Sequence, residues 1–224
     1  MPIRPGIVKL ASGHTRGVVV IEPGISDDAL DAMHALGVRG VRLNLMSPRV
    51  SDVAAAERML EPVAARIARL GWHIQIYADA GIIAPVASVI RRLAVPVVLD
   101  HMAGVRAEQG VDAADFIALL DLVAAGQCWV KLSGADIVTR RDDDFSGARP
   151  FMRALIAANV RRLVWGTDWP HLVHHSGAMG DAAPPAGYRP VGEPALLQLL
   201  CDCAPDEPAL RRILVDNPQQ LYAF

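Results

Sequence analysis

The chain repeats one unit, a short apolar run followed by a stretch with the spacing of an amphipathic helix. Each run is brief, rich in β-branched residues and apolar enough to be covered on both faces, which is typical of strands in a parallel sheet. The predicted strands are 17–21, 40–45, 73–78, 95–99, 128–132 and 163–165.

The helical segments between these runs carry recognisable start and stop signals. Ser26 is a suitable N-cap, and Gly37, Gly71 and Gly126 stand where helix C-termini belong. The predicted helices are 27–36, 53–70, 84–93, 113–125 and 150–158, and two more, 193–203 and 207–222, close the chain.

Strict alternation of strand and helix predicts an α/β fold with a parallel sheet and right-handed crossovers, either doubly wound or closed as a (β/α) barrel. A complete barrel needs eight strands and about 250 residues, whereas only six strands are predicted in these 224 residues. The length favours one domain, 1–224, with residues 1–15 left unassigned. No GxGxxG follows a strand, which argues against a dinucleotide fold.

Composition excludes several classes of partner. The chain is 52% hydrophobic and 21% charged with a formal net charge of -2, and no block of like charge points to nucleic acid or a membrane surface. No apolar stretch is long enough to span a bilayer, and the N-terminus lacks a secretory apolar region, so a cytoplasmic location is expected. Cys128, Cys201 and Cys203 form no disulfide or zinc pattern and are expected to be reduced.

Polar residues gather where the predicted strands end. In folds of this kind catalytic groups lie at the C-terminal ends of the strands. Side chains alternate along a strand, so that polar residues two apart share a face and converge on one pocket if that face is the barrel interior. The strand-end residues are Glu22, Arg42, Asn44, Tyr77, Asp79, Asp100, His101, Lys131, Ser133 and Asp168.

Asp168 and His101 are the leading candidates for chemistry. An Asp at a strand end can act as general base for water or bind a metal, and a neutral His beside it can bind the same metal or polarise a carbonyl. The alternatives remain open: Asp168 is also a suitable turn or N-cap residue in GTDWP, and His101 can be a core histidine that is hydrogen-bonded.

Arg42 can hold a substrate carboxylate with help from Tyr77, or it can form an internal ion pair with Glu22 or Asp79. Lys131 is expected to be an ion partner within the barrel rather than a nucleophile. The sequence after Asp168 contains three more histidines, of which His171 has the best claim to the site, while surface exposure is expected for His174 and His175.

Six segments in their order resemble the amidohydrolase-related family of TIM-barrel hydrolases, with the closest likeness to its 2-pyrone-4,6-dicarboxylate lactonase-like branch. The likeness extends from about residue 16 to residue 224. It implies a TIM-barrel-like fold that lacks the first two βα units. The segments are GVRGVRLNL, GWHIQIYAD, VVLDHMAG, VKLSGA, VWGTDWPH and the terminal NPQQLYAF.

The resemblance implies hydrolysis of a lactone or related cyclic ester of a small carboxylated substrate by activated water. On this interpretation Asp168 is the general base or a metal ligand, and His101 polarises the scissile carbonyl or binds the metal. Arg42 and Tyr77 bind substrate, and Asn44 and His171 are grouped with them. Whether a divalent metal, Zn or Mn, or no metal is bound stays open.

The chain departs from the family pattern at several points. It contains no HxH pair, which the family carries on its first strand, and Ala103 looks like an insertion in the DHxG segment. The family also has a substrate-binding Arg soon after the VKLSG strand, but Asp136 stands there, and Arg140 and Arg141 are the nearest substitutes.

Two further functions follow from these departures, an inactive truncated remnant that binds small carboxylates and a metal-dependent decarboxylase on the same scaffold. An open sheet would also expose two edges that invite pairing, so that a homo-oligomer is expected.

Overall fold

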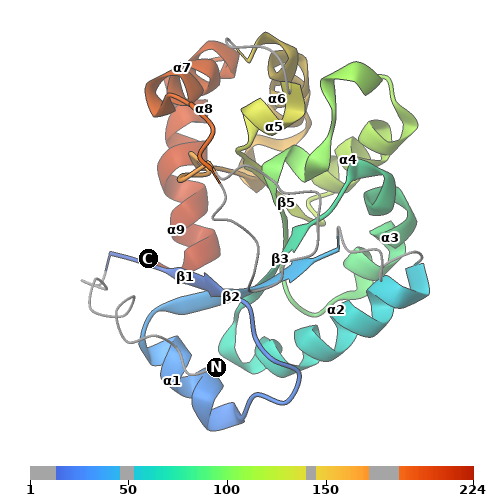
Figure 1. The fold of residues 1–224 in the computed structure, drawn as a ribbon, viewed down its shortest axis with the longest axis vertical. Coiled ribbons are helices and arrows are strands. Elements are labelled where there is room, and N and C mark those ends of the chain that lie inside the picture. Colours follow the sequence, from blue (N-terminus) through green and yellow to red (C-terminus); the bar gives the residue numbers. More distant parts are fainter. Residues whose placement is uncertain (1–13, 46–52, 140–144, 172–186) are drawn as a thin grey trace.

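The computed structural model describes residues 14–45, 53–139, 145–171 and 187–224. Its centre is a parallel sheet of six strands in the order β1-β2-β3-β4-β5-β6, curled into a half-barrel with helices around it (Figure 1). All six predicted strands are confirmed, the last with its predicted bounds and the other five with shifted bounds. The strands are β1 (Gly17–Val19), β2 (Val38–Asn44), β3 (His73–Tyr77), β4 (Val97–Leu99), β5 (Trp129–Leu132) and β6 (Leu163–Trp165).

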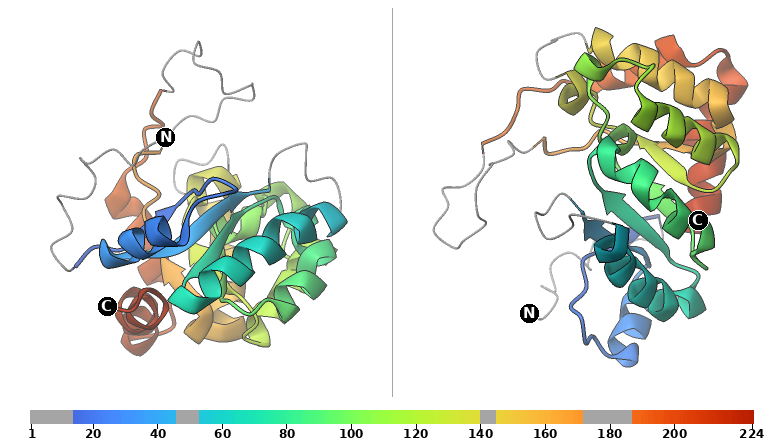
Figure 2. Two further views of the ribbon diagram at one scale, coloured as in Figure 1. Left: turned by 90° about the horizontal axis from the view of Figure 1, so that it is seen from below. Right: turned by 90° about the vertical axis from the view of Figure 1, so that its right-hand side faces the viewer.

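The connecting helices form a layer along the sheet. Within it α2 packs on α3, α3 on α4, α4 on α6 and α6 on α7. Figure 2 shows this layer from two further sides. The helices are α1 (Asp27–Ala35), α2 (Val53–Ile67), α3 (Ala80–Arg92), α4 (Ala114–Ala124), α5 (Ala135–Thr139), α6 (Arg149–Asn159), α7 (Glu193–Cys203), α8 (Glu207–Arg211) and α9 (Asn217–Tyr222).

Several helix bounds differ from the predicted ones. Helix α3 begins at Ala80 rather than at residue 84, because Pro85 is accommodated inside the helix instead of marking its start. The predicted helix 207–222 is divided into α8 and α9 by the π-helical turn η7 (Arg212–Asp216). The short helix α5 after β5 was not predicted, since five residues carry too little periodicity to be recognised.

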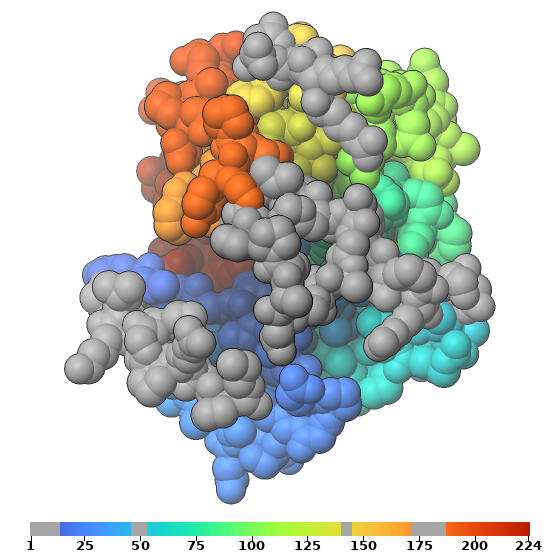
Figure 3. All heavy atoms as spheres, in the orientation of Figure 1, coloured from blue at the N-terminus to red at the C-terminus, as the bar shows by residue number. Residues whose placement is uncertain are grey.

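The C-terminal helix covers part of the inner face of the curled sheet. Leu221 and Tyr222 pack against a small cluster of Val98, Trp129 and Val164. Figure 3 shows the dark red atoms of this helix between the orange helix α7 and the blue N-terminal strands.

Hydrogen bonds fasten α9 near both sheet edges. The amide of Asn217 donates to the carbonyl oxygen of Leu163 at 2.6 Å, and Arg16 donates to the carbonyl oxygen of Ala223 at 2.8 Å. Among the described strands, β1 and β6 are the sheet edges and do not pair with each other. Self-association through these edges stays a prediction.

In the part of the chain that the structure describes, no helix is long and apolar enough to cross a membrane.

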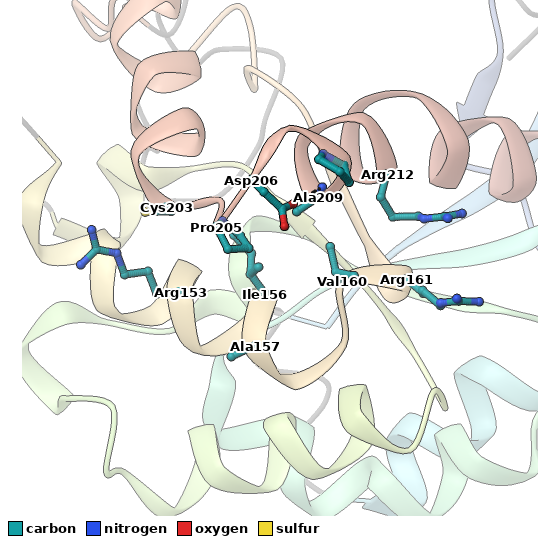
Figure 4. Close-up of a pocket in the computed structure, with 11 residues that line it drawn as sticks. Arg153, Ile156, Ala157, Val160, Arg161, Cys203, Pro205, Asp206, Ala209 and Arg212 are labelled. Carbon is teal, nitrogen blue, oxygen red and sulfur yellow. Dashed lines mark hydrogen bonds between the residues drawn. The ribbon is translucent and has the colours of Figure 1, made fainter.

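A surface pocket of about 450 Å³ lies between α6, the end of α7 and α8. Figure 4 shows Val160 and Arg161 among the side chains that line it. These residues precede β6 in the chain. The pocket therefore lies at the N-terminal ends of the strands, away from the strand-end residues that were predicted to carry chemistry.

Candidate functional site

The register of the sheet brings the predicted polar residues together. Arg42 lies opposite Gln75 and Asn44 opposite Tyr77 in the pairing of β2 with β3. Asp100 and His101 follow β4 directly, Ser133 follows β5, and Asp168 comes three residues after β6. These side chains gather at the C-terminal edge of the sheet because every strand runs in the same direction.

The buried carboxylate of Asp100 forms a polar layer of the site together with Lys131, Arg42 and Gln75. Its side chain is 1% exposed and lies 2.9 Å from the Lys131 ammonium and 3.4 Å from the Arg42 guanidinium. Gln75 donates to Asp100 at 2.8 Å and accepts from Lys131 at 3.0 Å.

Burial alone would raise the pKa of Asp100, but the positive charges of Lys131, His101 and Arg42 outweigh it and hold that pKa below its ordinary value. The prediction that Lys131 is an ion partner within the barrel is confirmed. The alternative that Arg42 forms an internal ion pair is confirmed, but its suggested partners Glu22 and Asp79 are wrong. Arg42 pairs with Asp100, and Asp79 pairs with Arg106 at 3.1 Å.

Asp168 and His101 lie together above this layer. Nε2 of His101 is 3.7 Å from Oδ1 of Asp168, and its Nδ1 is 3.0 Å from the Ser133 hydroxyl. Burial and the nearby Asp100 charge raise the pKa of Asp168 to about 6. A carboxylate with a pKa in this range can accept and return a proton near neutral pH.

Tyr77 and Arg42 border the same space. The Tyr77 ring meets the His101 ring edge-on with centroids 5.4 Å apart, and the Arg42 guanidinium carbon lies 5.2 Å from the centre of the Tyr77 ring. Four of the predicted site residues, Asp168, His101, Tyr77 and Arg42, therefore form one connected group.

The two other predicted substrate residues are placed differently. Asn44 is exposed at the end of β2. His171 is 3% exposed, and its Nε2 is 3.9 Å from a Glu193 carboxylate oxygen on α7. His174, His175, Arg140 and Arg141 lie outside the described residues.

The turns that carry Asp168 and His101 have unusual backbone conformations. His101, Met102 and Ala103 have φ values of 50, 49 and 59°, and Asp168 has a φ of 67°. Successive non-glycine residues in the left-handed region are energetically unfavourable and cluster at functional sites. The Ala103 insertion in the DHxG segment is thus part of a left-handed turn that follows β4.

Gly104 closes this turn with a φ of +69°, and a Cβ atom there would lie 2.2 Å from the Ala78 carbonyl oxygen. Gly104→Ala is therefore expected to destabilise the fold by at least about 2 kcal/mol. Thermal unfolding checks this, with Gly24→Ala as control, because a Cβ atom at Gly24 meets nothing within 4 Å. An unfolding temperature for Gly104→Ala equal to that of the wild type would contradict this account of the turn.

Two residues of the site were missed in the sequence. Arg189 lies beside Asp168, with 3.6 Å between Nη2 and Oδ2, and forms a close ion pair with Asp136 of α5. Arg189 follows a Gly- and Pro-rich stretch without periodicity, so no pattern marks it. Asp136 stood out only as the residue in place of an expected arginine.

The described residues provide an incomplete set of donors for a metal ion. Asp168 and His101 supply two donors, and no group of three or more His, Cys, Asp or Glu side chains in the described ranges could hold an ion. The Arg189 guanidinium near Asp168 places a competing positive charge where a cation would bind. Metal binding by Asp168 and His101 stays a prediction.

The chain is similar to a known family along nearly all of its length. The family model described as Amidohydrolase matches residues 8–224. The 4-sulfomuconolactone hydrolase of Hydrogenophaga intermedia is 32% identical over 219 residues, which cover 96% of this chain and 67% of that protein. The 2-pyrone-4,6-dicarboxylate hydrolase of Comamonas testosteroni is 32% identical over 223 residues, 96% of this chain and 68% of that protein.

A solved structure with a related name also has a similar fold. A crystal structure from Pseudomonas putida, named for 2-pyrone-4,6-dicarboxylic acid hydrolase, superposes with a TM-score of 0.77 at 27% identity. The match covers 97% of this chain and 75% of that one. The chain thus spans about two thirds to three quarters of the length of these relatives.

Proposed function

We propose that this chain, which belongs to the amidohydrolase family, is a hydrolase that opens a lactone or related cyclic ester of a small carboxylated substrate. The observation that carries the proposal is the pairing of Asp168 with His101 at the strand ends, where burial raises the pKa of Asp168 to about 6. The two relatives named as lactone hydrolases support the same reaction class.

In the proposed mechanism Asp168 takes a proton from water as the water oxygen attacks the lactone carbonyl carbon. Nδ1 of His101 is 3.0 Å from the Ser133 hydroxyl, and the mechanism assigns the hydroxyl as donor. In this tautomer Nε2 of His101 carries the proton that stabilises the negative charge on the carbonyl oxygen. The ring C–O bond then breaks, and protonated Asp168 returns its proton to the leaving oxygen. One water is consumed, and the ring opens to a single product that carries one new carboxylate and the hydroxyl group formed from the ring oxygen.

Arg42 and Tyr77 orient the substrate in this proposal. Arg42 is 38% exposed on the side chain although it contacts buried Asp100, so its guanidinium can also reach a substrate carboxylate. The Tyr77 ring lies between Arg42 and His101 and can present its hydroxyl to a substrate oxygen. Asn44, at the level of Tyr77, and His171 are proposed as further contacts.

The test is turnover of 2-pyrone-4,6-dicarboxylate and 4-sulfomuconolactone, followed as loss of the ring absorbance. We expect at least one to be opened. If neither reacts but a carboxylate still binds, the inactive remnant would be the better description. If carbon dioxide is released with the ring intact, the decarboxylase would replace the hydrolase.

The pH dependence provides a separate prediction. Asp168 must be ionised to act as base, and its pKa is raised to about 6 by burial first and by the Asp100 charge second. We therefore expect kcat/KM to rise as the pH increases through about 6 and then to level off. A rate that stays constant from pH 5 to pH 8, measured with the protein folded throughout, would exclude Asp168 as the base.

A further inference from the structure

The surface pocket between α6, α7 and α8 has the size of a small-molecule site. Its volume is about 450 Å³, within the range of about 300–1,000 Å³ that is usual for ligand pockets. Val160 and Arg161 on its wall precede β6, whereas Asp168 follows the other end of that strand. A molecule in this pocket would therefore leave Asp168 accessible to a ring substrate.

The pocket has an apolar and well-anchored wall. Ile156 and Ala157 belong to α6, Val160 begins the turn η6 (Val160–Arg162), and Pro205 stands before α8. Figure 4 shows Ile156 and Val160 below the pocket and Pro205 above it. Asn217, which is 1% exposed, donates to the carbonyl oxygen of Val160 at 2.7 Å and holds the turn in place. A preformed apolar wall of this kind suits a hydrocarbon group.

The charged side chains of the pocket favour an anion with a single charge. Three arginines, Arg153, Arg161 and Arg212, line it together with one carboxylate, Asp206. Oδ1 of Asp206 accepts from the backbone N–H of Ala209 at 2.8 Å and so caps α8. The excess of positive charge attracts an anion, while the Asp206 carboxylate in the same pocket disfavours a second negative charge.

Arg161 offers this anion an uncommitted guanidinium. In the part of the chain that the structure describes, the Arg161 side chain forms no ion pair or hydrogen bond, whereas its backbone N–H donates to Asn159 at 3.1 Å. A guanidinium binds carboxylates through charge-assisted hydrogen bonds in a fixed fork. The Arg161 side chain is therefore able to bind a carboxylate without giving up another partner.

Arg212 supplies a second guanidinium at the same end of the pocket. Figure 4 shows Arg161 and Arg212 extending toward one side and Arg153 toward the other. Nη1 of Arg212 is 3.4 Å from Asp216, a carboxylate that Arg211 also approaches at 3.7 Å, so the charge of Arg212 is only partly compensated. Arg212 also begins the π-helical turn η7, and such turns are rare and occur frequently at functional sites.

We propose that this pocket is a second ligand site, which binds a small organic monoanion with an apolar body. The carboxylate of the ligand lies between Arg161 and Arg212, and its hydrocarbon part covers Ile156, Val160 and Pro205. The site does not depend on the lactone hydrolase reaction, so that either can hold without the other.

Nuclear magnetic resonance of the nitrogen-15-labelled protein tests the site, with cyclohexanecarboxylate as the probe. We expect the backbone amide signals of Arg161, Ala209 and Arg212 to shift as the probe is added. Cyclohexanecarboxamide has the same shape without the charge and should bind at least about fivefold more weakly. Equal binding of the amide, or no shifts up to about 50 mM probe, would overturn the proposal. Shifts confined to Asp100 and His101 would place the probe in the catalytic site and would also overturn it.

Exposed positions of the pocket allow variants that test the charge and the shape separately. Arg161→Gln should weaken binding of the probe by about fivefold or more, because a guanidinium is lost. Ala157→Phe should block binding, since Ala157 is exposed and its side chain lines the pocket. Arg69→Gln, which breaks an exposed ion pair with Asp31 elsewhere on the surface, is the matched control and should bind like the wild type.

Asp206→Asn gives a test of opposite sign. Asparagine caps a helix about as well as aspartate, so α8 should stay in place while the negative charge in the pocket is removed. We expect the probe to bind about threefold more tightly to this variant. Weaker binding by Asp206→Asn, or unchanged binding by Arg161→Gln, would contradict an anion site in this pocket.

Discussion

Asp168→Asn is expected to lower the rate of lactone opening by about 10³-fold, because the amide cannot take the proton of the attacking water. Substrate binding should be nearly unchanged, since Arg42 and Tyr77 remain in place. Steady-state kinetics with 2-pyrone-4,6-dicarboxylate, together with the calorimetric affinity for benzene-1,3-dicarboxylate, measure the two effects separately. Asp202→Asn, which alters an exposed carboxylate on α7, is the matched control and should keep the wild-type rate.

The same variant should not lose stability. Burial raises the pKa of Asp168 above its unfolded value, so the favourable contribution of the protonated group is lost as the pH rises through about 6. At pH 8 the folded protein must keep Asp168 ionised in a partly buried position, which lowers its free energy of unfolding. Asp168→Asn, with a neutral amide, is therefore expected to unfold at the same or a higher temperature than the wild type. A large fall in the unfolding temperature of Asp168→Asn would mean that its inactivity reports damage to the fold.

Asp100→Asn is expected to have the largest effect on stability. Asp100 is 1% exposed and contacts both Lys131 and Arg42. Its replacement leaves the partly buried Lys131 ammonium without this carboxylate. Removing one partner of a buried ion pair costs about 3–5 kcal/mol. For a chain of this length the unfolding temperature should fall by about 10 °C. Differential scanning calorimetry at pH 7 measures this fall.

The loss of stability in Asp100→Asn should depend on pH and become smaller in acid. The folded pKa of Asp100 is lowered because nearby positive charges outweigh burial. Its contribution is therefore present above the unfolded pKa of about 3.9 and is lost as the pH falls through the folded value. The gap between wild type and Asp100→Asn should narrow in acid. The exposed Asp202→Asn should change the unfolding temperature little at any pH, because surface ion pairs contribute little to stability. An equal fall in both variants would contradict the buried network.

The strands and the main site residues could be predicted because they depend on local signals. Apolar runs of strand length and their polar ends are visible in the sequence, and parallel strands bring those ends to one edge. Asp168, His101, Arg42 and Tyr77 were identified in this way. The ion-pair partner of Arg42 could not be predicted, because four carboxylates stand at strand ends and only the folded sheet brings Asp100 within reach of Arg42.

The parts of the site that were missed depend on distant segments. Arg189 contacts the carbonyl of His171 through its backbone N–H and the carboxylate of Asp136 through its side chain. Neither contact follows from spacing along the chain. The packing of Tyr222 onto the inner face of the sheet likewise depends on a segment that is distant in the sequence. NPQQLY is recognisable as a helix, but nothing in its sequence states which surface it covers.

The measurement that tests the central claim most directly is the mass of the product formed from 2-pyrone-4,6-dicarboxylate in water enriched in oxygen-18. Hydrolysis by water activated at Asp168 predicts a product heavier than the substrate by one water molecule, with a single labelled oxygen in the new carboxylate. Asp168→Asn should form this product at least about 10³-fold more slowly. A product with the mass of the substrate, a product that has lost carbon dioxide, or an unchanged rate in Asp168→Asn would contradict the account.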